Sequence, residues 1–315
     1  MRPDVILPED RAAESPLSGR VVFLVATPET GAERLLRGLA ALPGVVAPPV
    51  PTHVFSQGLG EVLDHWVSGA EMINRFVRRQ PDDGTLMGFR MLSGLTDPET
   101  FLSHARTLGD ALLLPGFGES DGMLVEYSPF HINNVADIVT LYPDSHIVHV
   151  VRDGRQVAAR LASPLYMEEN PGEAARRWID EQHAVDEIAH HPMLSAVRIE
   201  GLDADPTTAL ALLAEAFGID AGDDDIERAI AAMGDPPPVV PSGAAGAIVD
   251  IAGADLLAKY GYGPEQRDTS TRLAAWAHLS SSAAGSFARR IATEGASSVV
   301  ERARAVASSV RRTEG

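Results

Sequence analysis

Two largely apolar runs, each followed by a turn and a helical pattern, constrain the fold of this chain more than any other feature. Val21–Ala26 and His146–Val151 have the length and the valine content of strands that are buried on both faces. Helical spacing follows the first run at Gly31–Leu42 and the second from about Gly154 to Ala162. Strands that alternate with helices pair in parallel, so this order predicts an α/β fold with a mainly parallel central sheet flanked by helices.

The remaining elements continue this alternation. We expect further strands at Thr85–Met91, Met123–Glu126 and Ala196–Ile199. We expect further helices at Glu61–Arg79, Pro98–Leu114, His131–Leu141, Pro171–His190 and Pro206–Phe217. Residues 44–60 and 236–246 are rich in proline and turn residues, and the second of these stretches predicts a flexible or lid-like loop.

Composition excludes several classes of protein. No apolar run approaches the ~18 residues that cross a bilayer, and residues 1–19 have acidic and proline breaks where a signal peptide needs its apolar stretch. We therefore expect a cytoplasmic protein. The absence of cysteine excludes disulfides, thiolate metal sites and cysteine nucleophiles. A net charge of −18 argues against a protein that binds nucleic acid.

Charge also divides the chain. Residues 269–315 hold seven arginines and three glutamates, so residues 1–268 carry the acidic excess. We place an N-terminal extension at 1–19, an α/β domain at 20–268 and a helical or partly disordered tail at 269–315. This tail either packs on the body or docks as a basic amphipathic segment on a membrane or a protein partner. Lys259 is the only lysine, so recognition of an anion must come almost entirely from arginine. The sequence does not define the oligomeric state.

The turn after the first run has the plan of a phosphate-binding loop. It consists of Pro28, Glu29, Thr30, Gly31, Ala32, Glu33 and Arg34. A strand, a tight turn and a helix place backbone N–H groups and the positive end of the helix dipole at the carboxyl edge of the sheet. That arrangement favours a phosphate or a sulfate.

A second candidate follows the other apolar run. Arg152 comes just past the end of the expected strand, and Asp153 and Gly154 begin the next helix. An arginine in this position is well placed to bind the phosphate of a nucleotide. A surface ion pair between Arg152 and Asp153 is the alternative that the sequence leaves open.

Five segments in the same order resemble the family of sulfotransferases that use 3′-phosphoadenosine-5′-phosphosulfate (PAPS), especially its bacterial branch. They are ATPETGAER (26–34), EYSPFH (126–131), YPDSHIVHVVRDGRQVAAR (142–160), AARRWIDEQ (174–182) and RIEGLDADP (198–206). The resemblance extends over roughly residues 20–218 and implies a P-loop-like sulfotransferase fold. It also implies that PAPS is the co-substrate and that a small molecule accepts the sulfuryl group.

The resemblance assigns roles to several of these residues. It implies that Pro28–Arg34 holds the 5′-phosphosulfate of PAPS and that Arg152 binds the 3′-phosphate. Arg160 stands where the family has a serine, and it either adds to the anion contact or faces solvent. Arg198 matches a family arginine, with a charge pair at the strand end as the alternative. We expect Arg155 at the surface.

The first loop departs from the family pattern in its charge. The family has a basic residue where this chain has Glu29, and two threonines where it has Ala32 and Glu33. Like charges about 4 Å apart repel by roughly 4 kcal/mol at an effective dielectric constant near 20. This loop should bind PAPS poorly unless another arginine, such as Arg34, takes the place of the missing base.

Sulfuryl transfer also needs a group that removes the proton of the acceptor. His53, in the stretch PTHVF, and His131, in EYSPFH, are the candidate bases, and Glu126 is a candidate catalytic or hydrogen-bonding carboxylate. Two further pairs of histidines, His190 with His191 and His146 with His149, lack companion ligands, so we expect no metal site.

Three functions follow from these residues. The first is sulfuryl transfer from PAPS to a hydroxyl or an amine of a small molecule, a lipid or a sugar. The second keeps the fold but not the donor and acts on a cationic or neutral substrate, because Glu29 and Glu33 would repel an anion and attract a cation. The third is a non-catalytic binding subunit. The sequence does not identify the acceptor, since acceptor pockets carry no transferable motif.

Overall fold

A parallel sheet lies at the centre of the fold. The computed structural model describes residues 15–60, 62–63, 98–118, 121–164, 170–265 and 275. The strands described are β1 (Val21–Val25), β2 (Val45–Val46), β3 (Met123–Tyr127), β4 (His146–Val151) and β5 (Leu194–Arg198). They form a five-stranded sheet in the order β2-β3-β1-β4-β5, and every neighbouring pair is parallel. The predicted α/β fold with a parallel central sheet flanked by helices is confirmed.

The chain divides into two compact units. Met1–Arg152 and Asp180–Pro238 form one unit, which contains all five of these strands and is called the sheet unit below. Asp153–Ile179 and Val239–Gly315 form the other, called the helical unit. The boundaries predicted at residues 20 and 268 stay a prediction.

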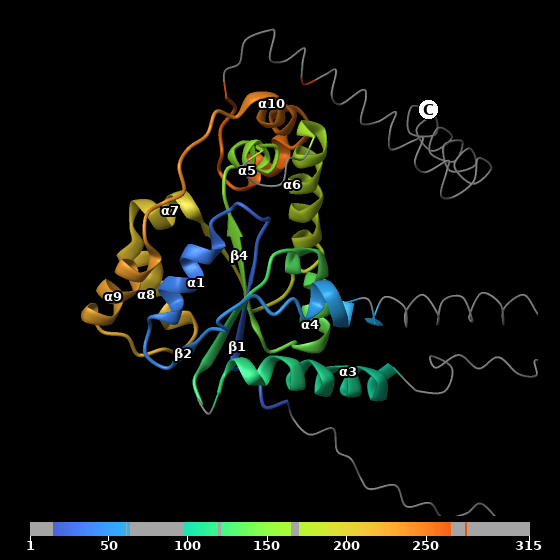
Figure 1. The fold of residues 1–315 in the computed structure, drawn as a ribbon, viewed down its shortest axis with the longest axis vertical. Helices are drawn as coiled ribbons and strands as arrows, with labels where there is room; N and C mark the ends of the chain where they lie inside the picture. The colour runs from blue at the N-terminus through green and yellow to red at the C-terminus, as the bar shows by residue number, and fades with distance from the viewer. Residues whose placement is uncertain are drawn as a thin grey trace, which may run out of the picture. The chain divides into compact units, whose positions relative to one another are not determined.

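Helices cover both faces of the sheet in the sheet unit. They are α1 (Ala32–Ala40), α3 (Pro98–Leu113), α4 (Val135–Leu141), the C-terminal end of α6 (Pro171–Asp186), α7 (Ile199–Ala204), α8 (Pro206–Ala216) and α9 (Asp223–Met233). Helices α1, α8 and α9 pack on one face, and α3, α4 and the end of α6 pack on the other (Figure 1).

The two faces follow from the alternation of side chains along each strand. Val22 and Leu24 of β1 pack with α1, α8 and α9, whereas Val21, Phe23 and Val25 pack with α3 and α4. All five side chains are fully buried. Because successive side chains of a strand point to opposite faces, a strand covered on both sides must be apolar throughout. The continuous run VVFLV meets that requirement.

Several boundaries differ from those predicted. The expected helix at His131–Leu141 is divided into a 3₁₀ turn, η4 (His131–Asn134), and α4. The strand expected to end at Ile199 ends at Arg198, and Ile199 is the first residue of α7. The predicted loop 44–60 contains the short strand β2 and a π-helical turn, η1 (Phe55–Leu59).

Three helices lie in segments for which no helix was predicted, and some predicted elements lie outside the described residues. Helices α9, α10 (Gly243–Ala252) and α11 (Ala254–Lys259) were not expected, and α10 replaces the second half of the predicted loop 236–246. The strand expected at Thr85–Met91 lies outside the described residues. So do most of the helix expected at Glu61–Arg79 and, except for residue 275, the whole predicted tail.

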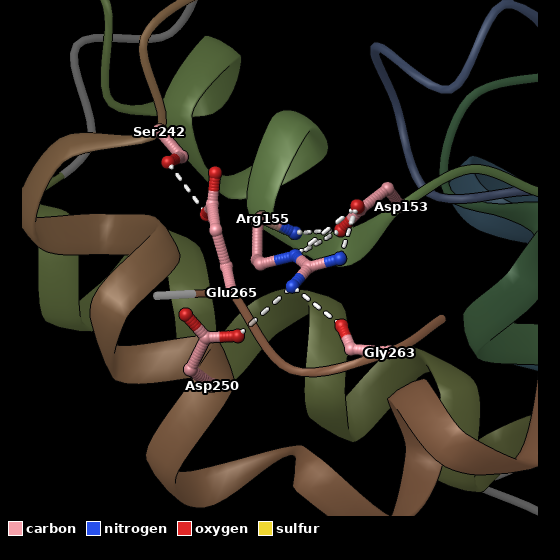
Figure 2. A network of polar contacts seen from close by, with 6 residues as sticks. All are labelled: Asp153, Arg155, Ser242, Asp250, Gly263 and Glu265. Atoms are coloured by element: carbon pink, nitrogen blue, oxygen red, sulfur yellow. Dashed lines mark hydrogen bonds and ion pairs between the residues drawn. The ribbon is translucent and has the colours of Figure 1, made fainter. Parts of the chain in front are cut away.

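A buried arginine organises the helical unit, in which α10 packs on α5 (Gly154–Leu161). Arg155 is only 7% exposed, so the expectation that it lies at the surface is wrong. Its guanidinium donates to Asp153 at 2.6 and 2.8 Å, to Asp250 of α10 at 3.2 Å and to the carbonyl oxygen of Gly263 at 2.8 Å (Figure 2). Asp250 comes from a helix 95 positions further along the chain, so local sequence does not reveal this burial.

Among the helices in the described part of the chain, none is long and apolar enough to cross a membrane.

The packing of Gly154 against Trp178 provides a test of the helical unit. A Cβ atom on Gly154 would lie 2.5 Å from the indole ring of Trp178, which is 1% exposed and has no room to move. We expect Gly154→Ala to lower the free energy of unfolding by about 1–3 kcal/mol in chemical denaturation. Gly201→Ala in α7 is the control, because the nearest atom to its Cβ is 4.0 Å away, and it should stabilise by about 0.5–1 kcal/mol. Equal stability of Gly154→Ala and the wild type would contradict this packing.

Candidate functional site

The sheet brings three functional segments to one edge. Strand β1 lies between β3 and β4, with Leu24 in register with Tyr127 on one side and Val148 on the other. Parallel strands end at the same edge, so the segments that follow β1, β3 and β4 come together there. The order of the strands reverses direction at β1, which is where ligands bind in open α/β sheets.

The loop after β1 has the geometry that the sequence predicts. Glu29 and Gly31 have positive φ angles of 69° and 101°, and Gly31 precedes the first residue of α1. The Thr30 hydroxyl donates to the Thr27 carbonyl oxygen at 2.5 Å, which closes the turn. Gln182 of α6 donates to the Thr27 hydroxyl at 3.1 Å. A glutamate in the left-handed region costs about 1–3 kcal/mol, and such strain is concentrated at functional sites.

Acidic side chains gather beside this loop, around Tyr127 at the end of β3. Burial raises the pKa of the Tyr127 phenol, and the charges of Glu33, Glu181 and Glu29 raise it further. Both acidic substitutions in the loop therefore act on the same place, and Glu181, which is 2% exposed, adds a third carboxylate that the sequence motifs do not indicate.

Arg34, the residue that was expected to replace the missing base of the loop, contacts other groups. Its guanidinium lies 2.5 Å from the carboxylate of Asp203 and donates to the carbonyl oxygen of Gly234 at 3.1 Å. The side chain is 7% exposed in this arrangement. The guanidinium is thus engaged by α7 and by the segment that follows α9. A role for Arg34 in binding the donor stays a prediction.

Arg152 lies where the sequence places it, directly after β4. It is 5% exposed, and its Nη2 atom lies 3.4 Å from the Pro237 carbonyl oxygen and 3.5 Å from that of Pro238. Pro237 also lies over the loop, since a Cβ on Gly31 would meet its ring at 3.6 Å. The proline-rich segment after α9 therefore contacts both parts of the predicted anion site.

The other two candidate arginines differ in burial and belong to different units. Arg198 is exposed at the end of β5, in the sheet unit. Arg160 is 5% exposed and belongs to α5 in the helical unit, so the alternative that it faces solvent is wrong.

A buried network connects Glu126 and His131, two of the three residues considered for catalysis. Both side chains are completely buried. Glu126 Oε2 lies 2.9 Å from His131 Nδ1, and Glu126 Oε1 accepts hydrogen bonds from the hydroxyls of Ser128 and, at 2.7 Å, Thr52. His131 Nε2 accepts the Phe55 N–H at 3.4 Å, which places the proton of the neutral ring on Nδ1. A role for His131 as the base stays a prediction.

His53 differs from His131 in its environment. It is half-buried, has a φ of 51°, and donates its backbone N–H to the Ser128 hydroxyl at 3.0 Å. Its ring Nδ1 lies 3.2 Å from the Ser56 hydroxyl. Because Ser128 directly follows β3, His53 is held at the same edge of the sheet as the loop after β1.

No group of three or more histidine or acidic side chains in the described part of the chain is arranged to hold a metal ion.

The fold and the site define an α/β protein whose candidate anion-binding groups meet at the carboxyl edge of a parallel sheet. Residues 22–224 match the model of the sulfotransferase family, and the chain belongs to that family. No curated protein sequence matches the chain.

Three solved structures illustrate the likeness. A sulfotransferase from Alicyclobacillus acidocaldarius is 15% identical, with 77% of this chain and 96% of that chain covered and a TM-score of 0.45. The sulfotransferase domain of the Synechococcus PCC 7002 olefin synthase is 16% identical, with coverage of 84% and 94% and a TM-score of 0.46. Sulfotransferase STF9 from Mycobacterium avium is 14% identical, with coverage of 81% and 80% and a TM-score of 0.47.

Two buried carboxylates in the sheet unit should respond to acid in opposite directions. Burial by itself would raise the pKa of Glu126, but the adjacent His131 and the hydroxyls of Ser128 and Thr52 outweigh burial and lower it. Asp110 is 7% exposed and accepts from the hydroxyls of Ser15 and Tyr142, yet burial prevails and raises its pKa. Glu126 therefore contributes stability that is lost as the pH falls through its folded pKa. The contribution of Asp110 is complete at low pH and is lost as the pH rises.

We expect Glu126→Gln to flatten the loss of stability between about pH 6 and pH 3.5, and Asp110→Asn to steepen it. Urea denaturation at a series of pH values measures both. The same slope change in the two variants would contradict the network around Glu126.

Proposed function

We propose that the protein transfers a sulfuryl group from PAPS to a hydroxyl or an amine of a small-molecule acceptor. Membership of the sulfotransferase family supports this, and the observation that carries it is the position of Arg152. This residue is buried directly after β4, beside the strand that leads into the loop at Pro28–Arg34. An arginine at that point of a parallel sheet suits a nucleotide phosphate.

The 3′-phosphate of the donor would bind at Arg152. The contacts of its guanidinium with the carbonyl oxygens of Pro237 and Pro238 are long, at 3.4 and 3.5 Å. A phosphate can form two parallel charge-assisted bonds with a guanidinium and would replace such contacts. Arg160 and Arg198 remain candidates for further contact with the donor.

The 5′-phosphosulfate would lie at the N-terminus of α1. Gly31 caps this helix without a side-chain hydrogen bond, so the helix end can receive an anion. Glu29 and Glu33 oppose that binding through their charge. We therefore expect the donor to be held mainly through its 3′ side and weakly through its 5′ side.

His53 is the base in this proposal, because His131 and Glu126 are fully buried and engaged with each other. The His53 ring removes the proton of the acceptor hydroxyl or amine. The acceptor atom forms a bond to sulfur as the bond between sulfur and the oxygen of the 5′-phosphate breaks. The products are the sulfated acceptor, the protonated imidazole and adenosine 3′,5′-bisphosphate (PAP), which carries the negative charge away.

A second candidate function rests on the carboxylates around Tyr127. Glu29, Glu33 and Glu181 act on this phenol together, and Arg34 is engaged with Asp203. This charge favours a cationic or neutral group at the loop. These carboxylates support a reaction that acts on such a substrate and does not use PAPS.

Calorimetric titration with PAP tests the donor site. We expect binding in the wild type and a loss of about 1.5–3 kcal/mol, or at least roughly tenfold in affinity, in Arg152→Ala. Arg152→Lys should recover only part of the loss, since an ammonium lacks the planar fork of a guanidinium. Arg228→Ala is the control, because Arg228 is exposed on α9 and pairs with Asp225. Binding that is unchanged in Arg152→Ala would contradict this assignment of the 3′-phosphate.

Reversal of the loop charge distinguishes the two candidate functions. We expect Glu29→Lys to raise the affinity for PAP about tenfold, because it removes a like charge and returns a base to the loop. Glu215→Lys makes the same change of charge at an exposed position of α8 and should have little effect. If neither the wild type nor Glu29→Lys binds PAP, PAPS is not the donor and the second function is favoured.

A further inference from the structure

We propose that Glu126 is a positioning residue, which holds the segment Thr52–Phe55 in place and thereby fixes His53 at the edge of the sheet. The inference rests on the proposed function for the role of His53 as the base. It gives Glu126 a task in the site although the side chain is completely buried and cannot reach a substrate.

Three successive backbone N–H groups of the segment donate hydrogen bonds to side chains that in turn contact the carboxylate of Glu126. The N–H of His53 donates to the Ser128 hydroxyl at 3.0 Å, and that hydroxyl donates to Glu126 Oε1. The N–H of Val54 donates to the Thr52 hydroxyl at 3.4 Å, and that hydroxyl donates to the same oxygen at 2.7 Å.

The third N–H reaches the other oxygen of the carboxylate. Phe55 donates to His131 Nε2 at 3.4 Å, and His131 Nδ1 lies 2.9 Å from Glu126 Oε2. Each of the three amides is thus connected to one carboxylate through a single side chain. Because buried N–H groups must find acceptors, the carboxylate determines the path of the backbone at His53.

The conformation of His53 explains why such an anchor is needed. Its φ of 51° is in the left-handed region, which side chains other than glycine rarely adopt. A residue stays there only where its surroundings fix it. Val54 and Phe55 are buried in the core cluster on the α4 face, so the segment is held on one side by packing and on the other by the network.

The chemistry of the network requires a carboxylate. Two hydroxyls donate to Glu126 Oε1, and His131 Nδ1 lies 2.9 Å from Glu126 Oε2. A glutamine of the same shape offers one acceptor oxygen and presents its NH₂ group to a donor. At least one of the three connections must then break or reverse its direction.

Asp110 is a matched comparison within the sheet unit. It is also a buried carboxylate that accepts from two hydroxyls, those of Ser15 and Tyr142, but neither hydroxyl accepts a backbone N–H of residues 52–55. If Glu126 had a general structural role alone, Glu126→Gln and Asp110→Asn should have the same effect on the segment.

Amide hydrogen exchange and NMR on the full chain test the proposal. In Glu126→Gln we expect at least one of the amides of His53, Val54 and Phe55 to exchange about tenfold faster or more, with β1 and β3 still protected. The ring signal of His53, assigned with His53→Gln, should shift in Glu126→Gln and stay unchanged in Asp110→Asn. Affinity for PAP should stay within about twofold, because no connection of the network reaches Arg152.

Milder variants keep the test decisive if Glu126→Gln does not fold. Ser128→Ala should release the amide of His53 alone, and Thr52→Val that of Val54 alone. Unchanged exchange at residues 53–55, or faster exchange throughout the sheet to the same degree, would overturn the proposal. Failure of the wild type to bind PAP would contradict the proposed donor, while the exchange pattern and the His53 ring signal would still decide whether Glu126 is the anchor.

Discussion

The parallel pairing of β1 with β3 and β4 is the constraint on which the site depends. It brings together three segments that are separate in the sequence: the loop after Ala26, the stretch from Glu126 to His131, which begins 100 residues later, and Arg152. Because parallel strands end at one edge, no local interaction is needed to assemble the site. The apolar runs that make β1 and β4 buried on both faces are therefore also what places the candidate functional groups.

Positive and negative charges are separated within this frame. The carboxylates of Glu29, Glu33 and Glu181 act on Tyr127, close to the loop in which the family pattern has a base. Arg34 and Arg152 contact the segment after α9, through the carbonyl oxygens of Gly234 and of the prolines that follow it. A donor held mainly through its 3′ side is consistent with this separation, and so is a substrate without a phosphate at the loop.

Each of the two units contains a buried charged side chain that connects several segments of the chain. In the sheet unit, Glu126 connects to three backbone amides of the segment that carries His53. In the helical unit, Arg155 binds Asp153, Asp250 and the carbonyl oxygen of Gly263. Each group has several polar partners, as burial of a charge requires. The first network ends at a candidate catalytic residue, whereas the second joins a helix to a segment more than 100 positions away.

The sequence by itself determined the class of fold, because strand burial and helix periodicity are local properties that can be read from runs such as VVFLV and HIVHVV. It also indicated the loop after β1 and the position of Arg152, since both depend only on where a strand ends. The tertiary structure alone decided which groups surround them. Three contacts illustrate this: Arg34 pairs with Asp203, Glu181 lies near Tyr127, and Arg155 is buried. Each depends on residues that are far apart in the chain, or on helices whose packing the local pattern does not determine. Local propensity carries no information about such partners, because the partner is chosen by the packing of whole elements.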